Sequence, residues 1–107
     1  MLDLNSGSLV KINRKSISPD GLLMLGTDNN GKICIYESIN LNSYPSSSDF
    51  FGNTIAVEDA EIGLVVRKVG RPCKIRQDTK FSCYDIYEII IKNKIYHAFR
   101  YNLDIDY

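Results

Sequence analysis

The chain has 107 residues, of which 13 are basic and 13 acidic, so its formal net charge at neutral pH is zero. This length suits one domain with a single modest core. A neutral balance lacks the strong positive charge that is typical of nucleic-acid-binding domains. The sequence has no apolar run near the roughly 18 residues of a membrane-spanning helix, and Met1–Val10 lacks the features of a secretory signal. We therefore expect no membrane partner and no export.

Cysteine usage indicates a reducing compartment. Cys34, Cys73 and Cys83 are odd in number and widely spaced, whereas disulfide frameworks use even and denser sets. We expect reduced thiols in the cytoplasm or in a particle assembled there. The cysteines and His97 also lack the short paired spacing of a zinc site, so we expect no metal and no cofactor.

Strand-like patterns dominate the N-terminal half, and no window shows the apolar stripe of an amphipathic helix. Ser8–Asn13 is the first expected strand. Leu22–Leu25 and Lys32–Glu37 flank Thr27–Gly31, whose asparagines and glycine favour a tight turn. This arrangement predicts a β-hairpin.

The stretch 38–54 is the least regular part of the sequence and predicts a long loop. It contains Tyr44-Pro45 followed by three serines, and Phe50 and Phe51 are expected to attach its end to the core. Long ordered loops often carry function. Tyr44, Phe50 and Phe51 are therefore candidate contact residues for another protein.

The C-terminal half predicts one further strand and a hairpin. Ile62–Val69 reads as a strand in which Gly63 marks a bulge or close packing. Phe81–Ile91 is expected to be extended, Lys92–Lys94 to be a tight turn, and 95–105 to be a strand with alternating apolar and polar side chains. The apolar face of that last strand is expected to carry Ile95, His97, Phe99, Tyr101, Leu103 and Ile105.

Five to six short strands in a chain of this size indicate an all-β fold, and closure into a small barrel would remove exposed edges. In Gly7–Ile12, Gly63–Val66 and 87–103 the sequence resembles the SH3-like β-barrel proteins of tailed bacteriophages. The resemblance implies an SH3-like barrel that serves as a capsid, neck or tail component, in the virion or in the cytoplasm of a bacterial host. It implies no catalytic residue. The chain departs from that pattern in its segment 38–51 and in its hairpin turn, where Asn-Gly or Asp-Gly is usual.

Catalytic constellations are not evident. Nucleophilic catalysis needs a serine or cysteine beside a base, and His97, the only histidine, is expected to be a half-buried core or rim residue. The carboxylates at 58–61 and 104–106 could perform acid–base work or hold a cation, but a solvated acidic face is the plainer interpretation. Phosphate-binding glycine motifs are absent from the sequence. We expect no enzymatic activity.

Six basic residues between positions 67 and 80 could line adjacent strands and face phosphates, with nearby aromatic rings stacking on bases. The other interpretation, which the neutral chain favours, is a charged face that keeps the sheet edge from pairing. The candidate nucleic-acid-binding residues are Arg67, Lys68, Arg71, Lys74 and Arg76.

Four of the seven tyrosines fall in the expected C-terminal hairpin, at Tyr84, Tyr87, Tyr96 and Tyr101. Tyrosine is common at protein interfaces because it buries a large area and keeps a polar end. Alternation along a strand would direct some of these rings away from the core, although ordinary strand composition explains them equally. We include all four as candidate interface residues.

The function that these observations favour is a non-enzymatic binding or assembly module. Its expected partners are other protein subunits in a homo- or hetero-oligomer, and a virion component is the specific form that the resemblance implies. The alternative is a nucleic-acid-binding barrel that uses the basic stretch.

Overall fold

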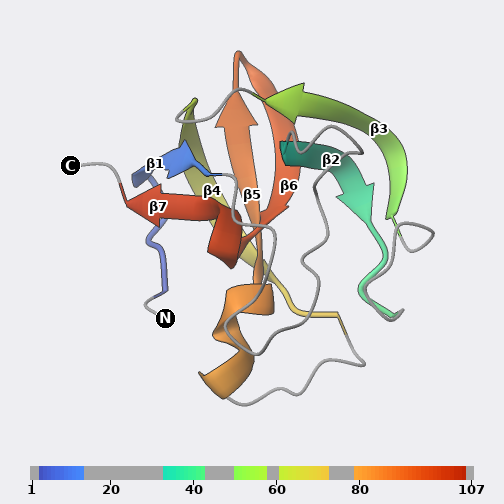
Figure 1. The fold of residues 1–107 in the computed structure, drawn as a ribbon, viewed down its shortest axis with the longest axis vertical. Coiled ribbons are helices and arrows are strands. Elements are labelled where there is room, and N and C mark those ends of the chain that lie inside the picture. Colours follow the sequence, from blue (N-terminus) through green and yellow to red (C-terminus); the bar gives the residue numbers. More distant parts are fainter. Residues whose placement is uncertain (1–2, 14–32, 43–49, 58–60, 73–78, 106–107) are drawn as a thin grey trace.

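The computed structural model describes residues 3–13, 33–42, 50–57, 61–72 and 79–105, with the backbone alone at 50–54 and 79–81 (Figure 1). Within these ranges two 3-10 helices, η2 (Thr79–Tyr84) and η3 (Arg100–Asn102), accompany the strands. The strands are β1 (Leu9–Ile12), β2 (Ile33–Ile39), β3 (Phe50–Val57), β4 (Ile62–Gly70), β5 (Ile86–Ile91), β6 (Lys94–Phe99) and β7 (Leu103–Ile105).

All seven strands belong to one antiparallel sheet, in the order β3-β2-β6-β5-β4-β1-β7. The all-β fold class is thus confirmed. Among the described residues β3 and β7 are the two edges, so the sheet is open and not closed into a barrel. The sheet is strongly curved, so that β1 and β7 run across the view in Figure 1 while β5 and β6 run along its vertical axis.

The β5–β6 hairpin confirms the turn that the sequence predicts. Ile91 pairs with Lys94, which leaves Lys92 and Asn93 as the two turn residues. Their φ angles are 52° and 67°, and positive φ at both positions defines the type I′ turn that matches the twist of a hairpin. Asparagine tolerates this left-handed conformation better than most residues.

The expectation of an extended chain from Phe81 is wrong in its first part. Residues up to Tyr84 form η2, and the turn closes where the Asp85 backbone N–H donates to the Ser82 carbonyl at 3.0 Å. The strand β5 begins only at Ile86. Aromatic residues favour strands by propensity, but here packing of Cys83 and Tyr84 into a separate cluster decides the local structure.

The predicted orientation of the last strand is also wrong. Tyr96 and Ala98 are buried in β6, whereas Ile95 is 48% exposed. The alternating run does not continue as one strand, because η3 interrupts it before Leu103. The apolar side chains of 95–105 therefore do not share one face.

The region 38–54 is shorter as a loop than the sequence predicts. β2 continues through Ile39 and β3 begins at Phe50, and these two residues are paired. Strand pairing satisfies the backbone polar groups of this polar stretch, although its side chains show no strand period. Outside the described residues lie Tyr44 and, from the predicted N-terminal hairpin, the strand at 22–25 with its turn. The described partners of β2 are β3 and β6.

The main core lies on one face of the sheet. Its members alternate along the strands with residues of the other face, as in Tyr87, Ile89 and Ile91 of β5. Gly63 is part of this packing, because a Cβ there would lie 3.4 Å from Ile91 Cγ1. This is an ordinary van der Waals distance, so close packing that would require glycine at this position is not shown. The irregularities of β4 fall further along, after Val65 and after Lys68.

A second, smaller cluster covers part of the opposite face, which we call the outer face. It lies at the end of β5 next to η2 and joins Ile86 and Phe99, which are cross-strand partners, to three residues around them. The Phe99 and Tyr101 rings stack at 5.3 Å, and Tyr84 meets both edge-on at 6.2 Å. The rest of the outer face, beyond Ile86 along β5, carries charged and apolar side chains such as Glu88 and Ile90.

Candidate protein-interaction surface

The four hairpin tyrosines do not form an exposed surface. Tyr84, Tyr87, Tyr96 and Tyr101 are all 5% exposed or less. Tyr87 and Tyr96 belong to the main core, whereas Tyr84 and Tyr101 belong to the second cluster on the outer face and are enclosed there. The contact role expected of these four residues stays a prediction. The side chains of Phe50 and Phe51 lie outside the described part of the structure, so their predicted contact role stays a prediction.

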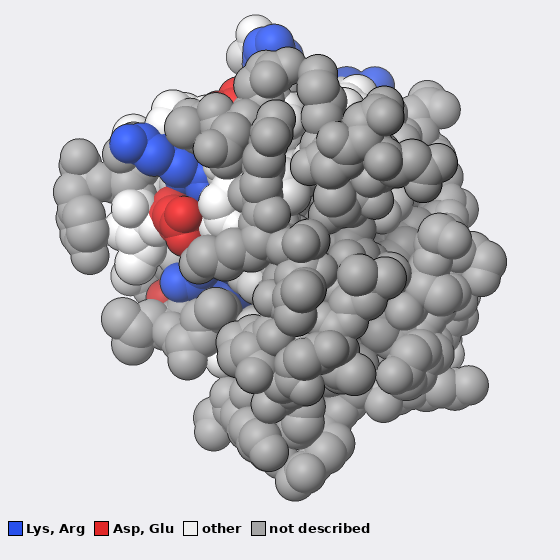
Figure 2. Space-filling view, in the orientation of Figure 1, with Lys and Arg blue, Asp and Glu red and all other residues white. Residues whose placement is uncertain are grey.

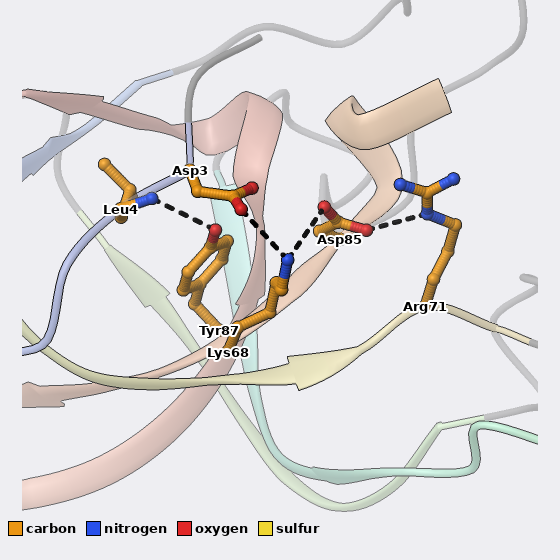
Figure 3. Close-up of polar contacts among 6 residues, drawn as sticks. All are labelled: Asp3, Leu4, Lys68, Arg71, Asp85 and Tyr87. Atoms are coloured by element: carbon orange, nitrogen blue, oxygen red, sulfur yellow. Dashed lines mark hydrogen bonds and ion pairs between the residues drawn. The ribbon is translucent and has the colours of Figure 1, made fainter. Parts of the chain in front are cut away.

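A buried ion pair lies where β4 ends and β5 begins (Figure 3). The Arg71 Nε–H donates to Asp85 Oδ1 at 2.7 Å, and both side chains are less than one-tenth exposed. Lys68 Nζ lies 4.0 Å from the other carboxylate oxygen of Asp85. The Asp85 carbonyl also accepts from the Arg100 N–H at 2.7 Å. These contacts connect β4, β5 and η3.

The N-terminal segment is attached to the same region. Lys68 Nζ donates to Asp3 Oδ2 at 3.2 Å, and the Leu4 N–H donates to the Tyr87 hydroxyl at 3.1 Å (Figure 3). The hydrogen bond to Asp3 raises the pKa of Lys68 above its ordinary value, and burial raises the pKa of Tyr87. Both shifts keep these groups protonated in the folded state. The polar groups of this region thus hold chain segments together.

The described part of the basic stretch carries little unneutralised charge. Arg67 makes a two-point contact with Glu88, from Nε at 3.1 Å and Nη2 at 2.9 Å. Lys68 and Arg71 have the carboxylate partners described above. Where described residues are visible in Figure 2, basic and acidic side chains lie next to one another. Lys74 and Arg76 lie outside the described residues, so phosphate binding by this stretch stays a prediction.

His97 belongs to a charged row that crosses the outer face. The pairings Arg67 with Glu88, Glu88 with His97, and His97 with Tyr36 place one residue from each of β4, β5, β6 and β2 side by side. His97 Nε2 lies 3.5 Å from Glu88 Oε1, and Nδ1 lies 2.9 Å from the Glu37 carbonyl. A carbonyl only accepts, so Nδ1 carries a proton. The expectation of a half-buried histidine is confirmed, but its neighbours are polar.

An apolar row runs parallel to the charged row on the outer face. The strand pairings align Leu9 with Leu64, Leu64 with Ile90, and Ile90 with Ile95, across β1, β4, β5 and β6. Leu9 is 48%, Leu64 37% and Ile95 48% exposed, and Ile90 is half-buried between them. Ile62, which lies beyond Leu64 on the same face, is 42% exposed. Large apolar side chains that adjoin on the surface mark interaction sites more often than scattered ones do.

Sequence reasoning missed the apolar row because its members come from four strands. Each lies in or next to an expected strand, but only the register places them side by side. Ile95 was expected to face the core. The row could have been predicted if the alternation of β6 had been read in the opposite phase, with Tyr96 and Ala98 facing inward and Ile95 facing outward.

The thiols and carboxylates do not form a separate site in the described residues. Neither Cys34 nor Cys83 is part of a disulfide bond, and Cys73 lies outside the described part. In the described ranges, no group of three or more histidine, cysteine, aspartate or glutamate side chains is arranged to hold a metal ion. No helix within these ranges is both long and apolar enough to cross a membrane.

Comparisons with known proteins add no relative. No protein family model matches the chain, and no curated protein or solved structure is significantly similar to it. The surface of the protein is therefore the basis for assigning it a function.

Proposed function

We propose that this chain is a non-enzymatic binding or assembly module, and that the apolar row is the surface through which it contacts another protein. The observation that carries the proposal is the exposure of Leu9, Leu64 and Ile95 in adjoining positions across the sheet. Burying apolar surface releases roughly 25 cal/mol for each Å² removed from water. Covering this row is therefore favourable.

The surroundings of the row support a protein partner. On one side lies the charged row with its Arg67–Glu88 ion pair, and on the other Lys92 Nζ lies 3.5 Å from Glu61 Oε1. An apolar centre with a charged, solvent-accessible rim is the usual organisation of a protein–protein interface. The rim carries both positive and negative charges. A protein partner, which also carries charges of both signs, fits such a rim better than a polyanion does.

A more specific proposal is an SH3-like module of a phage particle, as a capsid, neck or tail component. Its support is the resemblance of the opening strand, the Gly63–Val66 segment and the closing hairpin to such proteins. The described residues form an open sheet and support only the all-β class that such a module would share. An experimental structure in which the strand order differs from that of SH3-like proteins would remove this specific form and leave the binding module.

Site-specific photocrosslinking tests the proposed surface. A photoreactive phenylalanine derivative replaces Ile95 in one variant and Ala56, which is exposed on the edge strand β3, in the matched control. We expect a discrete protein adduct from position 95 only, and its loss when Leu64→Thr is added, because threonine keeps strand propensity but removes apolar area. The absence of any discrete adduct from position 95 would contradict the proposal.

A further inference from the structure

We propose that the partner covering the apolar row is a second copy of this chain, packed face to face about a two-fold axis that runs along the row. This inference rests on the proposed function and names its partner. A dimer of this kind brings the same patch of both copies together, so the patch must be complementary to itself. The positions of four charged residues on either side of the row meet that requirement.

Two of the four charges lie on each side of the row. Along β4, Arg67 follows Leu64 on one side and Glu61 precedes Ile62 on the other. Along β5, Glu88 lies two residues before Ile90, and Lys92 lies two residues after it. On one side of the row, the charge on β4 is therefore positive (Arg67) and the charge on β5 is negative (Glu88). On the other side the signs are reversed, with Glu61 negative and Lys92 positive.

A two-fold axis along the row exchanges its two sides but keeps each strand opposite the same strand of the second copy. Arg67 of one copy then faces Glu61 of the other, and Glu88 faces Lys92. The Arg67–Glu88 ion pair of one copy therefore faces the Glu61–Lys92 ion pair of the other copy. Leu64 and Ile90 of the two copies meet at the centre, where water is excluded.

Charge disfavours a symmetric arrangement whose axis lies on β5. An axis parallel to the strands and centred on β5 would place Glu88 opposite Glu88, and Arg67 opposite His97, because these residues flank β5 in one row. Like charges in apposition oppose association. Packed sheets also keep their strands within about 30° of each other, a requirement that both axes meet. An axis parallel to the strands but centred between β4 and β5 would also place opposite charges together, Arg67 with Glu88 and Glu61 with Lys92. Paired reversals of these charges leave those contacts attractive and make the contacts of the axis along the row repulsive, so they distinguish the two arrangements.

Paired charge reversals test this arrangement without removing either ion pair within a chain. The first variant carries Arg67→Glu with Glu88→Arg, and the second carries Glu61→Lys with Lys92→Glu. In each variant alone, like charges face each other across the dimer at all four contacts. In a mixture of the two variants, every contact across the heterodimer is again between opposite charges, and the same holds for the quadruple variant.

The measurement is sedimentation velocity of the purified full chain over a wide concentration range, after circular dichroism has shown that each variant is folded. We expect the original chain to dimerise, each double variant to have a dissociation constant at least about tenfold higher, and both the mixture and the quadruple variant to regain dimers. Leu64→Thr with Ile95→Thr is expected to abolish the dimer.

Two results would overturn the inference. A chain that stays monomeric at every concentration would exclude the second copy as partner, and dimers that ignore the reversals or the threonine substitutions would exclude this surface or this axis. The crosslinking experiment separates these failures from failure of the proposed function. An adduct from position 95 with a different protein refutes only the second copy, whereas no adduct refutes the binding surface itself.

Discussion

At the scale of single residues, Asp85 shows why a charged side chain is buried in this small protein. Its carboxylate accepts a hydrogen bond from Arg71 Nε at 2.7 Å. Its backbone N–H donates to the Ser82 carbonyl and its carbonyl accepts from the Arg100 N–H, at the point where η2 leads into β5. A buried charge is tolerated only when it is paired and hydrogen-bonded. Asp85 meets both conditions, and the pair connects the end of β4 to the start of β5.

Arg71→Ala is expected to lower the free energy of unfolding by about 3–5 kcal/mol, because it leaves the Asp85 carboxylate buried without its close partner. Urea denaturation measures this change. The matched control is Arg67→Ala, which removes an arginine whose side chain is 59% exposed and should cost less than about 1 kcal/mol. Equal losses of unfolding free energy in the two variants would show that the buried Arg71–Asp85 pair contributes no more to stability than the exposed Arg67–Glu88 pair.

At the scale of secondary-structure elements, the β5–β6 hairpin depends mainly on its own turn. The two turn residues have left-handed φ angles, and the strands continue the pairing from Ile91–Lys94 to Ile86–Phe99. Such a unit needs little from the rest of the chain to define its register. This is why its turn could be predicted from local sequence.

Substitution of Asn93 tests how much this turn matters. At a φ of 67°, Asn93→Gly should keep or raise the thermal midpoint, while Asn93→Val should destabilise the protein by about 1–2 kcal/mol, the cost of a left-handed conformation for a branched side chain. Differential scanning calorimetry of both variants measures this difference. A valine variant as stable as the glycine variant would contradict the type I′ turn.

Other elements depend on distant partners. Ser38 and Ile39 belong to β2 because Phe51 and Phe50 lie beside them, and the polar sequence of the region gives no sign of this pairing. Similarly, η2 replaces the expected start of a strand because its residues pack against Phe99 and Tyr101. Propensity within the segment could not show either outcome, since contacts made far along the chain decide them.

At the scale of the whole molecule, the protonation of buried and ion-paired groups links stability to alkaline pH. Burial raises the pKa of Tyr87 and Tyr101 above their ordinary value of 10.0, and the Asp3 hydrogen bond raises that of Lys68 above 10.5. Above pH 10 the unfolded chain releases these protons while the folded chain retains them. Stability contributed by these groups is therefore complete below pH 10 and falls as pH rises further.

We expect unfolding at alkaline pH to coincide with ionisation of the buried tyrosines. Tyrosinate absorbance and circular dichroism, followed together in one pH titration, should change in a single step above pH 10 for these residues. Tyr101→Phe should reduce the absorbance change of that step. Ionisation of the buried tyrosines at an ordinary pKa, with the sheet still intact, would show that these side chains are not buried as described.

The amino-acid sequence by itself determined the all-β class, the strands at Ser8–Asn13 and Ile62–Val69, and the turn at Lys92–Lys94. Each of these depends on residues close together in the chain, through alternation of side chains or the φ preferences of a turn. The tertiary structure decided which face of β6 is buried, where the four tyrosines lie, and which carboxylates neutralise Arg67, Lys68 and Arg71. It also aligned Leu9, Leu64, Ile90 and Ile95. These outcomes depend on strand register and on contacts between distant segments, and a shift of one residue in register would turn each side chain to the other face.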